Sequence, residues 1–447
     1  MIEIITQNRP DLVNDQLARI RTREIASDSA LTALVAGIIE DVRKRGDAAL
    51  VEYTRKFDGV ELSVDSLRIS EQDLKRSASR VDLEVLEALR ESIRRVRVFH
   101  ERQREASWEL ETGDGIRLGQ RITPIERVGL YVPGGTASYP SSVVMNVVPA
   151  HVAGVSQIAV VTPPKTLAES PAVAAALVEL GIDEIYSIGG AHSVAALAYG
   201  TETIPRVDKI TGPGNKYVAA AKRLVFGSVG IDSIAGPSEV VIIADASARA
   251  DYVAADLLAQ AEHAEDASSI LITTDIKLAE QVRTEVQTQL SNLPRRTIAS
   301  ESIKNYGAIF VVTNLSDACA IVNQLAPEHL EIMTEDPDSL VPQIKHAGAI
   351  FLGPHTPEAV GDYFAGPNHV LPTGGSVRFA SALGVYDFVK RTSILKFSKE
   401  ELERTTDMIV ALAKAEGLEA HARSTEIRRA ETKVSSDSME IGAKQNE

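Results

Sequence analysis

The sequence predicts an α/β protein built on largely parallel sheets. After Trp108, short apolar runs bounded by Gly and Pro alternate with Ala-rich helical segments, which is the pattern of parallel strands joined by helices. Apolar residues make up 44% of the 447 positions and charged residues 24%. The chain is therefore long and apolar enough for more than one globular core.

The part of the chain before Trp108 has a helical pattern. Apolar residues recur at helical spacing over residues 31–57, and again over residues 72–104, where many charges occupy the other face. These charges indicate a solvated helix face rather than a binding surface. We therefore expect helices in this part of the chain.

Buried strands and helices are expected to alternate in the middle of the chain. The strands are predicted at residues 158–161, 184–188, 240–244, 270–273, 309–312 and 349–352. The helices between them are predicted at residues 172–180, 217–225, 250–264 and 318–325. Near Pro354 a Gly- and Pro-rich stretch begins, and a polar helix is expected over residues 398–430. The final residues, VSSDSMEIGAKQNE, are expected to be disordered.

Charge and cysteine content restrict the expected partners and compartment. The formal net charge is −15, and a surface this negative repels nucleic acid and anionic membranes, so neither is an expected partner. Cys319 is the only cysteine, which excludes an intrachain disulfide and fits a reducing compartment. The sequence shows neither a secretory signal nor an apolar run of about 20 residues, so we expect a cytoplasmic protein.

Three glycine-containing turns could place backbone amides against a phosphate. They are Pro133-Gly134-Gly135, Gly189-Gly190-Ala191 and Gly212-Pro213-Gly214-Asn215, each between a predicted strand and a helical segment. The dinucleotide fingerprint G-x-G-x-x-G is missing from the sequence. Taken alone these turns are weak signals for a nucleotide site, because Gly and Pro at such positions more often serve the turn itself.

Gln260 and His263 lie three residues apart on a predicted helix, so their side chains share one face. That spacing suits a metal ion, although a hydrogen-bonded polar face would look the same. Glu328 and His329 follow Pro327 near a predicted helix end. Adjacent residues point in different directions and could serve two proton-transfer steps. Alternatively, they could simply be polar residues favoured at the end of a helix.

Two further pairs combine an acid with a histidine. Asp362 and His369 lie in the Gly-rich stretch, where a loop can bring side chains together around a ligand. Glu416 and His421 lie on the C-terminal helical segment, where a solvated helix face is the alternative. These residues indicate a zinc site built from His, Asp and Gln with one or two acid–base groups, but they do not define a reaction.

Seven long phrases resemble the histidinol dehydrogenase family. The resemblance runs from about Arg127 to His421, while the first hundred residues match more loosely, mainly in RKFDGV. The phrases are ERVGLYVPGGTASYPSSVVMN, GGAHSVAALAYGTE, VDKITGPGNKYVAAAKR, DSIAGPSEVVIIAD, LLAQAEHAEDA, APEHLEI and VGDYFAGPNHVLPTGG.

The resemblance implies a role for each matching position. Glu328 and His329 match the family's acid–base pair. The zinc ligands match Gln260, His263, Asp362 and His421. These ligands and His329 also contact substrate in the family, together with Ser238, His369 and Glu416. The NAD contacts match Tyr131, His192 and Asn215. The family usually has Gln where this chain has His192, and an imidazole offers fewer donor and acceptor atoms to NAD than an amide does.

The family's fold implies two incomplete Rossmann-like domains and a homodimer that exchanges small terminal pieces. The implied pieces are residues 1–25 as an N-terminal helical piece, 26–130 with 238–382 as the domain of the zinc and acid–base residues, 131–237 as the NAD-contacting domain, 383–430 as a C-terminal helical piece that completes the partner's site, and 431–447 as a disordered tail.

The implied reaction is oxidation of L-histidinol to L-histidine through L-histidinaldehyde, the last steps of histidine biosynthesis, with two NAD and a zinc ion that anchors the substrate. His329 would act in the alcohol step, and Glu328 would activate water in the aldehyde step. One alternative is a related dehydrogenase of another alcohol, such as sulfopropanediol; Glu416 favours histidinol because a carboxylate would hold an ammonium and repel a sulfonate. Another is an inactive binding protein, but such a protein would be expected to have lost some of these residues.

Overall fold

The computed structural model describes residues 2–21, 29–134, 139–234 and 236–440. The chain divides into two compact units, which are described separately below. The first unit comprises Met1–Arg104 and Pro124–Phe388, and the second comprises Glu105–Thr123 and Val389–Glu447. Among the described residues, no helix is long and apolar enough to cross a membrane.

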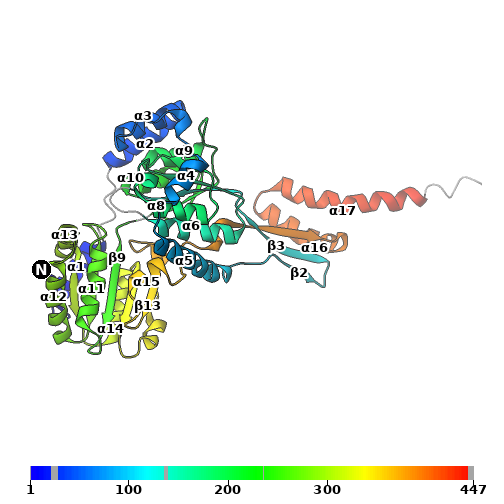
Figure 1. Cartoon of the computed structure of the whole chain (residues 1–447). Helices are drawn as coiled ribbons and strands as arrows, with labels where there is room; N and C mark the ends of the chain where they lie inside the picture. The colour runs from blue at the N-terminus through cyan, green and yellow to red at the C-terminus, as the bar shows by residue number, and fades with distance from the viewer. Residues whose placement is uncertain (1, 22–28, 135–138, 235, 441–447) are drawn as a thin grey trace, which may run out of the picture. The chain divides into compact units, whose positions relative to one another are not determined.

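A six-stranded parallel sheet forms one half of the first unit (Figure 1). Its strands, in spatial order, are β1 (Glu3–Thr6), β11 (Ala308–Val311), β10 (Ser268–Thr273), β9 (Glu239–Ala244), β12 (His329–Met333) and β13 (Ala349–Leu352). Central strands such as β9 are buried along their whole length, as expected for a parallel sheet covered on both faces.

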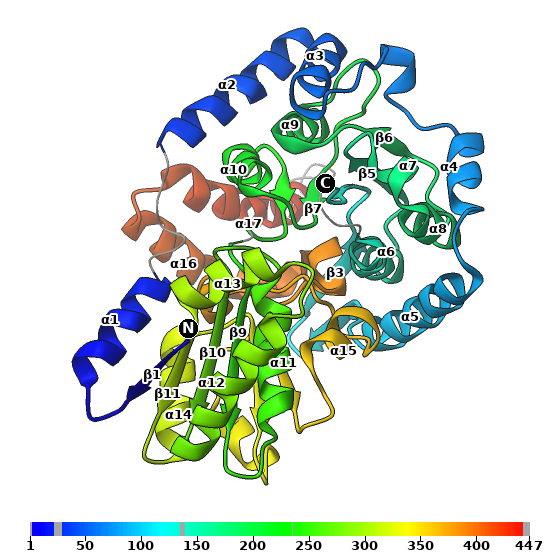
Figure 2. The same ribbon diagram turned by 60° about the vertical axis from the view of Figure 1, so that its left-hand side comes forward.

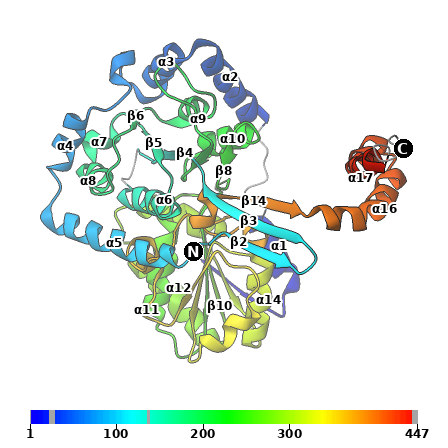
Figure 3. The same ribbon diagram turned by 90° about the vertical axis from the view of Figure 1, so that its right-hand side faces the viewer.

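Helices cover both faces of this sheet (Figure 3). One face packs against α11 (Ala250–Ala261), α12 (Ile276–Leu290) and α13 (Arg296–Tyr306). The other face packs against α1 (Pro10–Arg21) and α14 (Leu315–Leu325).

A five-stranded parallel sheet forms the other half of the first unit (Figure 2). Its strands, in spatial order, are β6 (Ile185–Ser187), β5 (Gln157–Thr162), β4 (Arg127–Tyr131), β7 (Lys209–Thr211) and β8 (Gly230–Ile231). The strand order runs one way from β4 through β5 to β6 and the other way from β4 through β7 to β8. This reversal is a topological switch point, where α/β proteins commonly bind ligands at the carboxyl ends of the strands.

The helices of this half lie in two layers. One layer contains α5 (Leu83–Glu101), α6 (Pro140–Ala153) and α8 (Pro171–Glu179), and the other contains α2 (Ser29–Arg45), α9 (Gly190–Tyr199) and α10 (Lys216–Val225). The remaining helices of the first unit are α3 (Asp47–Asp58), α4 (Glu71–Ala78), α7 (Thr166–Glu169) and α15 (Glu358–Tyr363), with short 3₁₀ helices at Val64–Ser66, Asp338–Gln343, Ser376–Arg378 and Val385–Phe388.

The predicted α/β class with parallel sheets is confirmed, and all six predicted strands are present. The helical pattern of residues 31–57 is divided into α2 and α3 at Gly46, which has a φ of 54°. The expected helical piece over residues 1–25 also contains a strand, because β1 pairs with β11. The pattern is helical over most of that region, but residues 3–6 are four extended positions whose pairing partner lies far along the chain. The strands expected before the first and third glycine turns are β4 and β7, whereas β8 (Gly230–Ile231) and β12 were not predicted.

The second unit contains a three-stranded sheet and two helices. The strands are β2 (Trp108–Thr112), β3 (Ile116–Pro124) and β14 (Val389–Phe397), and β2 pairs antiparallel with β3. Helices α16 (Lys399–Ala415) and α17 (Glu419–Glu440) pack against each other. Residues 431–440 of the tail expected to be disordered belong to α17, while residues 441–447, like residues 22–25 of the expected N-terminal piece, lie outside the described residues.

Candidate functional site

A pocket of about 250 Å³ lies between the two sheets of the first unit. On one side it is lined by residues at the amino edge of the six-stranded sheet, namely Ser238, Glu328 and His329. On the other side it is lined by Gly212 and Gly214 from the turn that follows β7. The amino edge of one sheet thus meets the carboxyl edge of the other at the switch point.

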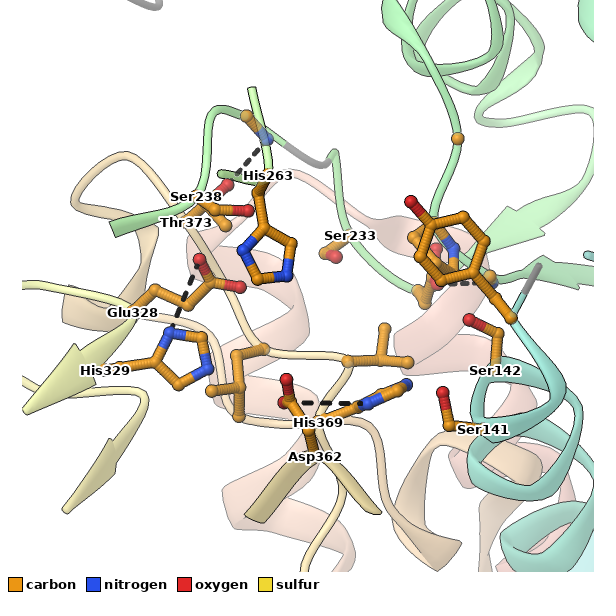
Figure 4. A pocket seen from close by; sticks show the side chains of 18 of the residues that line it. Ser141, Ser142, Ser233, Ser238, His263, Glu328, His329, Asp362, His369 and Thr373 are labelled. Atoms are coloured by element: carbon orange, nitrogen blue, oxygen red, sulfur yellow. Dashed lines mark hydrogen bonds and ion pairs between the residues drawn. The ribbon is translucent and has the colours of Figure 1, made fainter. Parts of the chain in front are cut away.

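Six of the residues singled out from the sequence line this one pocket. Figure 4 shows most of their side chains directed toward a common space. The six are Ser238, His263, Glu328, His329, Asp362 and His369. Residues from distant parts of the chain therefore converge here, although the pairs were identified separately in the sequence.

Three possible metal ligands converge in this pocket. One ligand atom from each of His263, Glu358 and Asp362 lies within 4.8 Å of the others. Glu358 and Asp362 lie four residues apart on α15, so both carboxylates project from one helix face. One imidazole and two carboxylates are a donor set that suits zinc and similar divalent cations.

Gln260 adjoins the same cluster from α11. It is completely buried, and with its amide oriented to match donors with acceptors, its nitrogen donates to both oxygens of Glu358 at 2.6 Å. Its oxygen then accepts from the backbone N–H of Glu239 at 3.2 Å. Burial, together with the nearby Asp362 charge, raises the pKa of Glu358 well above its usual range.

His329 is held in one tautomer by the start of β9. Its Nδ1 lies 3.1 Å from the carbonyl oxygen of Glu239. A carbonyl can only accept, so Nδ1 carries the proton and Nε2 has the lone pair. Burial lowers the pKa of His329 to about 4, so the imidazole is neutral near pH 7 and can accept a proton.

Glu328 is anchored beside His329. One of its carboxylate oxygens accepts from the backbone N–H of Glu239 at 3.1 Å, and the same oxygen lies 3.8 Å from His329 Nδ1. His329 is the first residue of β12 rather than part of a helix end. Of the two alternatives left open by the sequence, helix-end polarity does not describe His329, because this residue opens a buried strand.

His369 and Asp362 form a second imidazole–carboxylate pair in the pocket. The Nδ1 of His369 lies 3.7 Å from an oxygen of Asp362. Burial lowers the pKa of His369, so this histidine is also favoured in its neutral form.

The three residues expected to contact NAD surround the switch point of the five-stranded sheet but do not line the pocket. The Tyr131 hydroxyl accepts from the backbone N–H of Gly190 at 3.1 Å, and burial raises the pKa of Tyr131 to about 12. Asn215 is exposed and caps α10 by accepting from two backbone N–H groups. Gly135 of the first predicted turn lies outside the described residues.

His192 is a buried residue on α9 that lies beside two aromatic side chains. It is 1% exposed, its Nε2 lies 3.4 Å from the Thr54 hydroxyl, and its ring is near those of Tyr53 and Phe57. Burial lowers the pKa of His192 to about 4.

Glu416 and His421 belong to the second unit. Glu416 follows the last residue of α16, His421 lies in the first turn of α17, and both are exposed. Neither is among the residues that line the pocket of the first unit.

Sequence reasoning missed Glu358, Lys222 and Asp232, all of which line the pocket. Glu358 could have been found, since it lies four residues before Asp362 in PEAVGDYF. Lys222 and Asp232 had no such signal, because an ordinary amphipathic helix and an ordinary turn would carry the same residues.

The fold and the pocket define the class of protein. A two-sheet parallel α/β unit whose pocket holds a neutral imidazole, a carboxylate beside it and a cluster of possible metal ligands has the groups that acid–base enzymes use.

Comparison with known proteins gives the family. The family model for histidinol dehydrogenase matches residues 21–429. Histidinol dehydrogenase of Geobacillus kaustophilus is 55% identical over 409 residues, covering 91% of this chain and 96% of the relative, and that of Bacillus subtilis is 54% identical over 395 residues, covering 88% and 92%. The crystal structure of histidinol dehydrogenase from Elizabethkingia anophelis matches with a TM-score of 0.89 at 35% identity, covering 97% of this chain and 99% of the other. The chain belongs to the histidinol dehydrogenase family and is an oxidoreductase.

Proposed function

We propose that this chain oxidises L-histidinol to L-histidine through L-histidinaldehyde, using two molecules of NAD and a zinc ion. The observation that carries the proposal is the convergence of His329, Glu328 and the group of His263, Glu358 and Asp362 in one pocket. Its volume of about 250 Å³ suits a small amino alcohol. The reaction belongs to histidine biosynthesis in the cytoplasm.

The donor set supports a bound zinc ion. His263 and Asp362 would hold it, with Gln260 from the buried end of α11 and His421 supplied by the second unit of a partner subunit. When bound, zinc would anchor the amino and imidazole nitrogens of the substrate and so orient it. Glu358, which contacts Gln260, would support this set or contribute an oxygen itself.

The switch point of the five-stranded sheet supports a dinucleotide site. The Gly212–Asn215 turn links β7 to the amino end of α10, where backbone N–H groups favour an anion. Tyr131, His192 and Asn215 would contribute to this site. NAD would supply the hydride acceptor, which no side chain can provide.

The acid–base residues divide the proton transfers between them. His329 would use its Nε2 lone pair to take the proton of the alcohol as it becomes an aldehyde. Glu328 would then take a proton from water as the water adds to the aldehyde carbon, with His329 assisting. Ser238 and His369 would hold the substrate between these groups and the metal ligands.

A water-based second step agrees with the position of the single cysteine. Cys319 lies on α14, is 2% exposed and packs in the apolar core of the six-stranded sheet. Burial raises the pKa of its thiol, so its nucleophilic thiolate form is disfavoured.

A homodimer would complete each site. Glu416 and His421 would extend into the site of a partner subunit, where Glu416 would bind the ammonium group of the substrate. A crosslinked or mixed dimer of two inactive variants, such as His329→Asn and His421→Asn, would regain activity at one of its two sites.

The experiment that tests the function measures NADH formed per L-histidinol consumed, with added zinc and after chelation. We expect two NADH per substrate, loss of activity on chelation, and recovery on adding zinc. No oxidation of L-histidinol by folded, zinc-loaded protein would contradict the proposed substrate and favour another alcohol, which assays with sulfopropanediol would then test.

A further inference from the structure

Glu331 is a buried carboxyl that the proposed chemistry does not use. It lies in the middle of β12, is 1% exposed, and is flanked in register by Ile242 on β9 and Phe351 on β13. Burying a carboxyl among apolar strands costs free energy unless it has a partner. An apolar side chain would stabilise this strand better, so core packing does not explain why a carboxyl occupies this position.

The partner of Glu331 is the beginning of helix α15. Its Oε1 accepts from the backbone N–H of Glu358, the first residue of that helix, at 2.9 Å. The first N–H groups of a helix have no partner within the helix, so this bond fixes where α15 starts. At the other end, the Ser92 hydroxyl donates to the carbonyl oxygen of Tyr363 at 2.7 Å, and the short helix is held at both ends.

Glu331 also contacts the second helix of the candidate metal site. Its carboxyl interacts with that of Asp256 on α11. Asp256 lies four residues before Gln260, so both project from the same face of α11. Glu331 therefore joins the helix that carries Gln260 to the helix that carries Glu358 and Asp362.

We propose that Glu331 is a positioning residue for the metal site, an inference that rests on the function proposed above. By accepting the Glu358 N–H, it sets the position of α15, so that the carboxylates of Glu358 and Asp362 face His263. Without this bond α15 would be free to shift away from the sheet, and the ligand atoms that now lie within 4.8 Å of one another would separate.

Two conservative variants separate the length of this side chain from its carboxyl group. Glu331→Gln keeps the length and an oxygen acceptor but replaces the carboxyl group with an amide, whereas Glu331→Asp keeps the carboxyl group but withdraws the acceptor by one methylene. Met333→Leu, two residues further on the same face of β12, controls for general disturbance of the strand.

Zinc affinity of the full-length protein is measured by competition with a chromophoric chelator, and the visible absorption of the cobalt-loaded protein reports ligand geometry. We expect Glu331→Gln and Met333→Leu to bind zinc within about threefold of the unchanged protein, and Glu331→Asp to bind it about 10- to 100-fold more weakly with an altered cobalt spectrum. Thermal unfolding of the metal-free proteins is measured alongside.

A wild-type affinity in Glu331→Asp, or an equal loss in both Glu331 variants, would overturn the positioning role. So would lowered melting temperatures with unchanged zinc affinity, because that is the result of a purely structural role. If the unchanged protein itself binds no zinc, the proposed metal site fails first, and this result is distinct from a failure of the Glu331 variants alone.

Discussion

Lys222 and Asp232 form a buried ion pair that holds Gly212 from both sides. Their side chains are 3% and 4% exposed. The Lys222 ammonium donates to the carbonyl oxygen of Gly212 at 3.0 Å, while an Asp232 oxygen accepts from the Gly212 N–H at 2.8 Å. The pair thereby fixes the turn after β7, where the proposed dinucleotide site begins.

Replacing Lys222 with Met should strongly destabilise the protein, because it leaves the Asp232 carboxylate buried without its cation. We expect a loss of about 3–5 kcal/mol in the free energy of unfolding, measured by urea denaturation, and a raised KM for NAD. Lys209 and Asp387 provide a matched control, since that pair is more exposed at 13% and 22%. Lys209→Met should lower the free energy of unfolding clearly less than Lys222→Met does. Equal losses in the two variants would contradict the role given to burial.

Substituting Gly212 with Ala should disrupt the same turn. Gly212 has a φ of 111°, and a Cβ there would lie 2.2 Å from the backbone oxygen of Tyr131, which cannot move aside. We expect a destabilisation of about 3 kcal/mol or more together with weaker NAD binding. In contrast, Gly37→Ala in α2 meets nothing within 4 Å and should stabilise the protein by about 0.5–1 kcal/mol. Calorimetric unfolding of both variants tests whether the two substitutions change the free energy of unfolding in opposite directions.

His192 should make the folded state sensitive to acid. Its pKa falls from an ordinary value of about 6.5 to about 4 on burial. Between these values the unfolded chain binds a proton that the folded chain does not, so stability is intact above pH 6.5 and is lost as the pH falls toward 4. His192→Gln removes this linkage. Between pH 7 and pH 5 we expect the free energy of unfolding of this variant to fall by about 2 kcal/mol less than that of the unchanged protein. Urea denaturation at both pH values tests this, and equal losses in the two proteins would refute it.

Changing Glu328 to Gln should separate the two oxidation steps. The amide oxygen can still accept from the Glu239 N–H, so the side chain keeps its position but can no longer take a proton from water. We expect oxidation of L-histidinaldehyde to slow by about 10²- to 10⁴-fold, and oxidation of L-histidinol much less. Single-turnover assays with each substrate measure the difference. The assigned role would be untenable with equal slowing of the two steps.

The residues around β12 show how far sequence reasoning reached. The runs that became β9 and β10 are entirely apolar or nearly so, and they were predicted because a strand covered on both faces needs such a run. In β12, Glu331 interrupts the run after His329, and the strand was missed. The polar residues that concealed this strand are those that serve the pocket and α15.

The sequence by itself determined the parallel α/β class and the family, because hydrophobic periodicity is local and the family's phrases are long. It also identified most of the pocket's histidines and carboxylates as separate pairs. Only the tertiary structure brought Glu358 together with His263 and Asp362, and only it placed the amino edge of one sheet against the carboxyl edge of the other. Such contacts depend on strand order and on packing between residues far apart in the chain, which local periodicity does not encode.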